Sequence, residues 1–280
     1  MEQLRITHIG GPTALIELDG WRILTDPTFD DPGRRYRFGL GTSSVKTGRP
    51  ALQPADLGPV DAVLLSHDHH ADNLDSLGRQ MLPSVPTVLT TRSGAKRLAL
   101  PNTHGLRPWE QMTLRNPGIS PLRIIATPGR HGPALSLPVV GQTLGFALQR
   151  PGADTIALWM SGDSVLYRGL KDVARRFEID VALLHLGAVR FGITGPVRYT
   201  MNAREGARLL KLIRPQVAIP VHYEGWSHFS EGRDLALKHL RVAPDGVTEV
   251  LWLPPGRSVP IPLRSTRPAT TGTSPEGRSP

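Results

Sequence analysis

A short polar segment carries the residues best suited to chemistry. Residues 66–75 read Ser-His-Asp-His-His-Ala-Asp-Asn-Leu-Asp, with three His and three Asp among nine consecutive positions. These side chains cannot form a buried face of their own, because unpaired imidazoles and carboxylates are costly in an apolar interior. Imidazole nitrogen and carboxylate oxygen are the ligands that Zn²⁺ takes when sulfur is absent. The segment therefore favours a metal site over a solvated polar loop. Its candidate ligands are His67, His69, His70 and Asp72.

Three further candidate ligands lie farther along the chain, each just beyond a predicted strand. They are His131 after residues 122–127, Asp163 after residues 155–160, and His222 after residues 217–221. A lone His is more often structural than functional. The repeated placement at strand ends, however, lets separate strands bring these side chains to one pocket. Together with the polar segment, they favour a two-metal hydrolytic centre.

The elements that must position these residues begin with strands. Residues 4–9 alternate in polarity, and residues 14–18 and 21–25 flank an Asp-Gly pair, which is a strong hairpin signal. A stretch containing many Gly, Pro and Arg residues follows over residues 27–59. Loops of this length are often functional or contain short elements of their own.

Beyond that stretch, strands and helices alternate. The predicted strands are residues 60–65, 85–91, 122–127, 144–149, 155–160, 181–185, 217–221 and 248–253. The predicted helices are residues 94–100 with Ser93 as the cap, residues 170–177, and residues 202–213, which open with Asn202 and Glu205 spaced as in a capping box. This order predicts a layered α/β architecture with mixed sheets.

Length and composition fit one globular domain. The chain has 280 residues, of which 39% are hydrophobic and 20% are charged, so it can bury a core. We expect a single domain over residues 1–264 and a disordered tail over residues 265–280, which contain no large apolar residue. The absence of cysteine excludes disulfides, Cys-ligated metals and thiol nucleophiles. No run approaches the roughly 18 apolar residues of a membrane span, and we expect a cytoplasmic protein.

The charge balance is basic and dominated by arginine. The net charge is +9, and five of the 33 basic residues are Lys, so 28 are Arg. Composition bias and solubility are one explanation, and attraction for an anionic partner is the other, because guanidinium pairs well with carboxylates and phosphates. The basic residues are scattered rather than clustered with aromatics, so a nucleic-acid surface has no strong support. We expect a small-molecule or lipid-like anionic substrate.

The order of the polar segment, His131, Asp163 and His222 resembles that of the metallo-β-lactamase superfamily. Residues 8–17, His-Ile-Gly-Gly-Pro-Thr-Ala-Leu-Ile-Glu, resemble the branch that contains N-acyl-phosphatidylethanolamine phospholipase D and ascorbate-6-phosphate lactonase. The resemblance covers roughly residues 4–253. It implies an αββα sandwich, in which two mixed β-sheets pack face to face with helices outside and metals at one edge.

The polar segment departs from the family pattern His-x-His-x-Asp-His. Read from His67, the pattern meets Ala71 where Asp belongs. Read backward from the Leu-Asp pair at 74–75, which the family shares, Asp72 takes the role of Asp and Asn73 replaces the last His. We favour this second register, which contains a one-residue insertion.

Under this register the resemblance implies two metal sites. The first would be held by His67, by either His69 or His70, and by His131; the second would be held by Asp72 and His222, with Asp163 bridging the two. Asn is a poor zinc ligand beside His, so the second site is expected to be weaker, to take another metal, or to be empty.

The resemblance also implies a hydrolase that uses a metal-bound hydroxide on an ester, lactone or phosphodiester. The expected cofactor is Zn²⁺, as one or two ions, with manganese and iron as alternatives. Asp72 would orient the hydroxide and accept a proton. Side chains expected to contact substrate or to support the ligands are Asn73, His185, Tyr223, His228 and Asp26.

A second hypothesis is a metal-binding protein without hydrolytic activity, either a ligand sensor or a degenerate enzyme. The missing last His of the pattern motivates it. Nucleotide-binding glycine loops and a Gly-x-Ser-x-Gly elbow do not occur in the sequence, so a nucleotide-binding loop and serine-hydrolase chemistry have no support.

Overall fold

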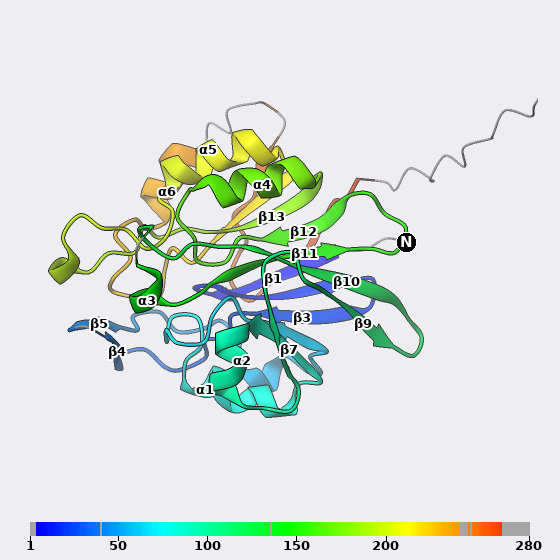
Figure 1. The fold of residues 1–280 in the computed structure, drawn as a ribbon, viewed down its shortest axis with the longest axis horizontal. Coiled ribbons are helices and arrows are strands. Elements are labelled where there is room, and N and C mark those ends of the chain that lie inside the picture. Colours follow the sequence, from blue (N-terminus) through cyan, green and yellow to red (C-terminus); the bar gives the residue numbers. More distant parts are fainter. Residues whose placement is uncertain (1–3, 40, 135, 241–245, 247, 265–280) are drawn as a thin grey trace, which may run out of the picture.

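Two β-sheets lie face to face, and helices cover the outer face of each (Figure 1). The structure is a computed structural model that describes residues 4–39, 41–134, 136–240, 246 and 248–264. The architecture is the αββα sandwich that the family resemblance implies. None of the described helices is long and apolar enough to cross a membrane. The predicted tail, residues 265–280, lies outside the described residues.

The first sheet brings the polar segment to one edge. Its seven strands have the order β16-β1-β2-β3-β6-β7-β8. They are β1 (Leu4–Gly10), β2 (Thr13–Leu18), β3 (Trp21–Thr25), β6 (Ala62–Leu64), β7 (Thr87–Thr91), β8 (Thr103–Leu106) and β16 (Ser258–Ile261). β3 and β6 pair in parallel, so their carboxyl ends lie at the same edge. Asp26 directly follows β3, and the polar segment begins two residues after β6.

The second sheet brings the remaining candidate ligands to one edge. Its order is β15-β14-β13-β12-β11-β10-β9. Its strands are β9 (Gln111–Asn116), β10 (Ile119–Pro128), β11 (Leu144–Gln149), β12 (Ile156–Met160), β13 (Ile179–His185), β14 (Val217–Val221) and β15 (Glu249–Val250). β12, β13 and β14 are parallel, and β10 runs in the same direction as β12 because each is antiparallel to β11. The carboxyl ends of β10, β12, β13 and β14 therefore share an edge.

Central strands are buried on both faces, which explains their nearly continuous apolar sequences. In β6, Leu64 packs between the sheets, whereas Val63 packs on the outer side of the first sheet. In β13, Leu183 points between the sheets and Leu184 points toward the helices. The period of two along each strand thus divides the apolar side chains among three layers of core.

Helices close the two outer layers (Figure 1). α4 (Arg168–Arg176), α5 (Ala203–Ile213) and α6 (Arg233–Leu240) cover the second sheet, and α1 (Ser76–Met81) and α2 (Arg92–Leu98) lie against the first. The predicted capping box of α5 is confirmed, because Asn202 and Glu205 each accept a hydrogen bond from the other's backbone N–H. The short helix α3 (Leu137–Val140) and 3₁₀ turns at Pro54–Asp56, Leu82–Ser84 and Gly192–Thr194 lie in connections.

Several element predictions were wrong in detail. The cap of α2 is Thr91 rather than Ser93: the Thr91 hydroxyl accepts from Gly94 N at 2.9 Å, and the helix begins two residues earlier than predicted. The final predicted strand, residues 248–253, contains only the two residues of β15. By contrast, the stretch over residues 27–59 does contain short elements of its own, as its length indicated: β4 (Arg35–Gly39) and β5 (Thr42–Val45) form a β-hairpin.

Candidate metal centre

Three buried imidazoles meet beyond β6 and β10. His67, His70 and His131 offer ligand atoms that all lie within 4.8 Å of one another. His70 Nδ1 is 3.1 Å from His67 Nε2 and 3.1 Å from His131 Nε2. His67 Nε2 and His131 Nε2 thus both point at His70 Nδ1. Hydrogen bonds among neutral imidazoles can satisfy these three nitrogens only in part.

These imidazoles are held neutral. Burial, reinforced by the neighbouring imidazoles, lowers the pKa of His67 and of His70 well below the usual 6.5. Burial also lowers the pKa of His131 to about 3. Neutral imidazole is the form that binds a metal ion, so this group has the chemistry of a cation site.

Two carboxylates and one imidazole form a second group. Asp72, Asp163 and His222 also bring ligand atoms within 4.8 Å of one another. His222 Nε2 lies 3.4 Å from Asp72 Oδ2 and 3.4 Å from Asp163 Oδ2. His222 Nε2, Asp72 Oδ1 and both oxygens of Asp163 are buried without a hydrogen-bond partner among the described residues. Converging buried atoms without partners are expected where a cation belongs.

The titration of this group reflects its charges. Burial lowers the pKa of His222, but the carboxylates of Asp163 and Asp72 outweigh burial and raise it to about 9. Burial raises the pKa of Asp163 to about 6. Burial also favours the neutral acid at Asp72, yet the imidazoles of His222 and His228 hold its pKa well below the usual range. Asp72 is therefore ionised near neutral pH.

A tight turn in the first sheet positions His222. The Gly-Gly turn between β1 and β2 places Gly11 at φ +55°, and the Gly11 carbonyl accepts from His222 N at 2.7 Å. His222 itself has φ +57°, a left-handed conformation that non-glycine residues rarely adopt. Backbone strain of this kind tends to occur at functional sites.

The two groups face one small cavity. His70 and His131 of the first group and Asp72 of the second line a space of about 70 Å³. Most of the remaining wall is apolar and includes Phe38 and Phe191. We call this space the aromatic cavity.

His69 lies beside the imidazole group but outside it. Its Nε2 lies within hydrogen-bonding distance of the Val140 carbonyl, and its Nδ1 is 3.8 Å from Asp68 Oδ1. Of the two alternatives at this position, the structure places His70, and not His69, within reach of both His67 and His131.

Asp26 connects three supporting residues behind the candidate ligands. Its Oδ1 accepts from Ser66 N at 2.6 Å, and its Oδ2 accepts from Asn73 Nδ2 at 3.3 Å. His185 Nε2 lies 3.2 Å from the same Oδ2. His185 is fully buried and does not line the aromatic cavity. Burial lowers its pKa to about 3, so it is neutral.

His228 contacts Asp72 from the other side. Its Nε2 lies 2.9 Å from Asp72 Oδ2, and its Nδ1 lies within hydrogen-bonding distance of Ser44 Oγ. Its ring stacks on Phe191, with centroids 5.2 Å apart. Ser44, Phe38 and Phe191 were not among the predicted site residues. Two of them, Phe38 and Ser44, lie in the stretch over residues 27–59, whose length indicates either a functional segment or short elements of its own.

Tyr223 points away from both groups. Its ring packs against Trp252, with centroids 5.1 Å apart, within the core between the second sheet and its helices. It does not line the aromatic cavity.

Comparisons with known proteins show a family match and similar relatives. The family model described as "Beta-lactamase superfamily domain" matches residues 21–223. A "UPF0173 metal-dependent hydrolase" of Caldivirga maquilingensis is 28% identical over 250 residues, covering 85% of this chain and 93% of that protein.

Solved structures share the fold at low sequence identity. A possible metal-dependent hydrolase from Veillonella parvula superposes with a TM-score of 0.74 at 17% identity and covers 92% of this chain and 99% of that one. An isothiocyanate hydrolase from Delia radicum gut bacteria superposes with a TM-score of 0.72 at 20% identity and covers 91% and 98%.

The sandwich fold and the two buried His/Asp groups define a metal-dependent hydrolase of the metallo-β-lactamase fold. The chain belongs to the metallo-β-lactamase superfamily. Membership of this class supports the hypothesis of an enzyme over the alternative hypothesis of a metal-binding protein without hydrolytic activity.

Proposed function

We propose that the protein hydrolyses an ester, lactone or phosphodiester at a metal centre formed by both groups. The observation that carries this proposal is the convergence of two adjacent groups of buried ligand atoms, several without partners, on one cavity. His67, His70 and His131 would hold the first ion, and Asp72, Asp163 and His222 would hold the second. The predicted bridging role of Asp163 stays a prediction, as does the finer placement in the phospholipase D and lactonase branch.

The donor set suits several metals. Nitrogen and oxygen ligands without sulfur are compatible with Zn²⁺, and also with manganese or iron. When bound, the metal would supply acidity to a water molecule near neutral pH and positive charge for a developing oxyanion. Asn73 stands where the family pattern has its last His, and its Nδ2 donates to Asp26 and Ser66, each at 3.3 Å. We therefore expect the second ion to bind more weakly than the first.

The chain's own residues have distinct tasks in this proposal. Asp72, ionised near neutral pH, presents Oδ1 as an acceptor that orients the attacking water. His228 fixes the other oxygen of Asp72. Asp26 and His185 act through the residues that they position, so of the two roles expected for His185 we propose support of the ligands rather than contact with substrate.

The wall of the aromatic cavity restricts what lies next to the reacting bond. Phe38, Phe191 and Tyr199 surround it, and no Lys, Arg or Glu is among its described lining residues. An apolar group beside the reacting bond fits this wall better than a charged one. The anionic group that we expect on the substrate must therefore lie farther from the metal centre.

A turnover panel tests the proposal. Metal-loaded protein is assayed with an aryl ester, a lactone, an aryl phosphodiester and a phospholipid, and with benzyl isothiocyanate because one structural neighbour is named for that chemistry. We expect turnover of at least one compound, lost on chelation and reduced by about 100-fold or more in Asp72→Asn. Asp172→Asn, an exposed carboxylate on α4 paired with Arg175, is the matched control and should retain activity. Turnover that survives both chelation and Asp72→Asn would contradict the proposal, as would inactivity of the loaded protein toward the whole panel.

A further inference from the structure

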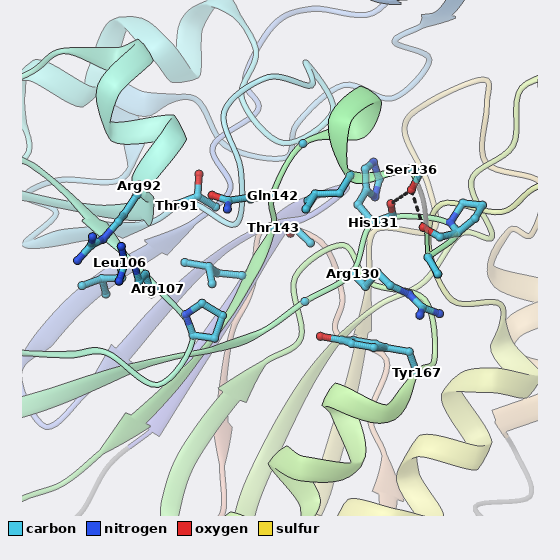
Figure 2. A pocket seen from close by; sticks show the side chains of 17 residues that line it. Thr91, Arg92, Leu106, Arg107, Arg130, His131, Ser136, Gln142, Thr143 and Tyr167 are labelled. Atoms are coloured by element: carbon cyan, nitrogen blue, oxygen red, sulfur yellow. Dashed lines mark hydrogen bonds between the residues drawn. The ribbon is translucent and has the colours of Figure 1, made fainter.

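A second and larger pocket adjoins the metal centre from the other side of His131. Its volume is about 470 Å³, which lies in the range of small-molecule sites. Its wall combines residues from the start of α2, from the β8–β9 and β10–α3 connections, and from the segment between α3 and β11 (Figure 2). We call it the arginine pocket, after Arg92, Arg107 and Arg130 in its lining.

The lining of the arginine pocket is cationic without compensating acids. No Asp or Glu is among its described residues. Arg92 is paired with Glu110 outside the lining, at 2.9 Å. In the part of the chain that the structure describes, no carboxylate pairs with the side chain of Arg107 or of Arg130. Two guanidinium groups at the pocket are therefore available to a ligand.

Arg130 is held in place but lacks an acceptor. Its guanidinium lies over the ring of Tyr167, with Cζ 4.7 Å from the centroid, and Figure 2 shows the two together at one end of the pocket. Its Nε is buried and has no hydrogen-bond partner among the described residues. A buried donor without an acceptor is costly, so a ligand oxygen here would gain both a charge and a hydrogen bond.

A second polar atom in the lining lacks a partner in the same way. Thr143 is 4% exposed, and its hydroxyl makes no hydrogen bond to the described residues. It lines the arginine pocket together with Arg130. Two unpartnered polar groups from separate segments indicate a built polar site rather than a chance hollow in the surface.

Apolar side chains form part of the remaining wall. Leu106, Pro108, Leu137 and Leu144 line the pocket between its polar groups. Apolar walls with a few polar groups that fix orientation are typical of sites for organic molecules. A small inorganic ion would not contact these apolar side chains, whereas an organic ligand would.

We propose that the arginine pocket binds a small organic anion, a carboxylate or phosphate group on an apolar carbon skeleton. Arg130 pairs with the anionic group, because guanidinium matches the geometry of carboxylate and phosphate oxygens. Arg107 lies at the opposite end beside Arg92 (Figure 2) and adds positive potential there. This site does not depend on the proposed hydrolytic activity.

Calorimetric titration tests the site directly. The probes are phenylacetate and phenylphosphonate, which separate carboxylate from phosphorus-based anions, and neutral phenylacetamide as the uncharged match. Each is titrated into metal-loaded and chelator-treated protein. We expect saturable binding of at least one anion to both forms. The neutral amide should bind at least about tenfold more weakly than that anion.

Variants locate the binding. Arg130→Gln should weaken anion binding about tenfold and Arg107→Gln about threefold; Arg130→Lys, which keeps the charge but loses Nε and the planar guanidinium, should weaken it less than Arg130→Gln but measurably. Arg175→Gln, an exposed arginine on α4 paired with Asp172, is the control and should bind normally. Metal content, measured in each variant, should not change. Arg107 is exposed, so its variant tests the proposal even if Arg130→Gln folds poorly.

Several results would overturn the proposal. They are the absence of saturable binding of either anion, equal binding of the neutral amide, and unchanged anion binding in both Arg130→Gln and Arg107→Gln. Loss of binding on metal removal would also overturn it, because the anion would then be a ligand of the metal rather than of the arginine pocket.

Discussion

At the scale of single residues, Asp26 shows how one buried carboxylate organises the site. It follows β3, has φ +31°, and contacts Ser66, Asn73 and His185. Burial raises the pKa of Asp26 to about 7, because it outweighs the hydrogen bonds from Ser66 and Asn73, which favour the charged carboxylate. The sequence analysis left its role open between contact with substrate and support of the ligands. It gains these partners because β6 pairs with β3 and because β13 of the second sheet ends at His185, and no local sequence pattern predicts that these strand ends meet.

The choice between His69 and His70 also belongs to this scale. We predict that His70→Ala strips metal from the first group, because His70 Nδ1 is the atom toward which both His67 and His131 point. His69→Ala should keep near-native metal content, because His69 contacts Val140 instead. Elemental analysis of the two purified variants checks this. Equal, mild losses from both would show the assignment to be wrong.

Protonation of His222 gives a second prediction at the residue scale. Its raised pKa, about 9, means that the imidazole is protonated below pH 9 in the metal-free protein. Metal must displace that proton, so affinity at the second group should rise with pH up to about 9. The lowered pKa values of His67, His70 and His131 predict no such release at the first group near neutral pH.

Calorimetry in buffers of different ionisation enthalpy counts these protons. At pH 7.5 we expect about one proton released on filling the second group and almost none on filling the first. Equal release from both steps, or none from either, would contradict the charge assignment.

At the scale of elements, strands with strong apolar patterns were predicted and short or exposed elements were not. β12, β13 and β14 are buried throughout and were placed within two residues of their observed bounds. The β4–β5 hairpin could not be predicted from the sequence, because most of its residues are polar or exposed and its tertiary partners lie far away in sequence. Ser44 of β5, for example, contacts His228. Such an element is stabilised by distant contacts rather than by its own periodicity.

The corrected cap of α2 leads to a prediction at this scale. Thr91→Ala should lower the free energy of unfolding by about 1 kcal/mol, because it leaves Gly94 N without its acceptor. Ser93→Ala should cost less, since among the described residues the Ser93 hydroxyl hydrogen-bonds to the side chains of Thr91 and Gln142 and not to the helix backbone. Urea unfolding of both variants measures the difference. A larger loss for Ser93→Ala would restore the cap predicted from the sequence.

At the scale of the whole molecule, two sheets that are remote in sequence share one site. The family resemblance predicted the sandwich. The candidate ligands could be predicted because each of these residues follows a strand, and the carboxyl ends of those strands lie at the same edge. It could not predict the arginine pocket or the aromatic cavity, which depend on how connections between elements pack. The single domain over residues 1–264 and the cytoplasmic location stay predictions.

The buried polar groups predict that metal supports the fold. Removing it leaves Asp72, Asp163 and His222 with buried atoms that lack partners, and a ligand present at about 1,000 times its Kd contributes about 4 kcal/mol to stability. We therefore expect chelation to lower the free energy of unfolding by several kcal/mol, as measured with urea. In His70→Ala the chelator should have a smaller effect. An identical effect in both proteins would mean that the stabilising ion binds elsewhere.

The central claim is that the two groups hold metal ions side by side. Anomalous diffraction from crystals of the metal-loaded protein, recorded on either side of the metal's absorption edge, tests it most directly. We predict one peak bound by His67, His70 and His131, and a second, weaker peak bound by Asp72, Asp163 and His222. A loaded protein with no peak at either group, or with its ion held by His69 away from His131, would contradict the account.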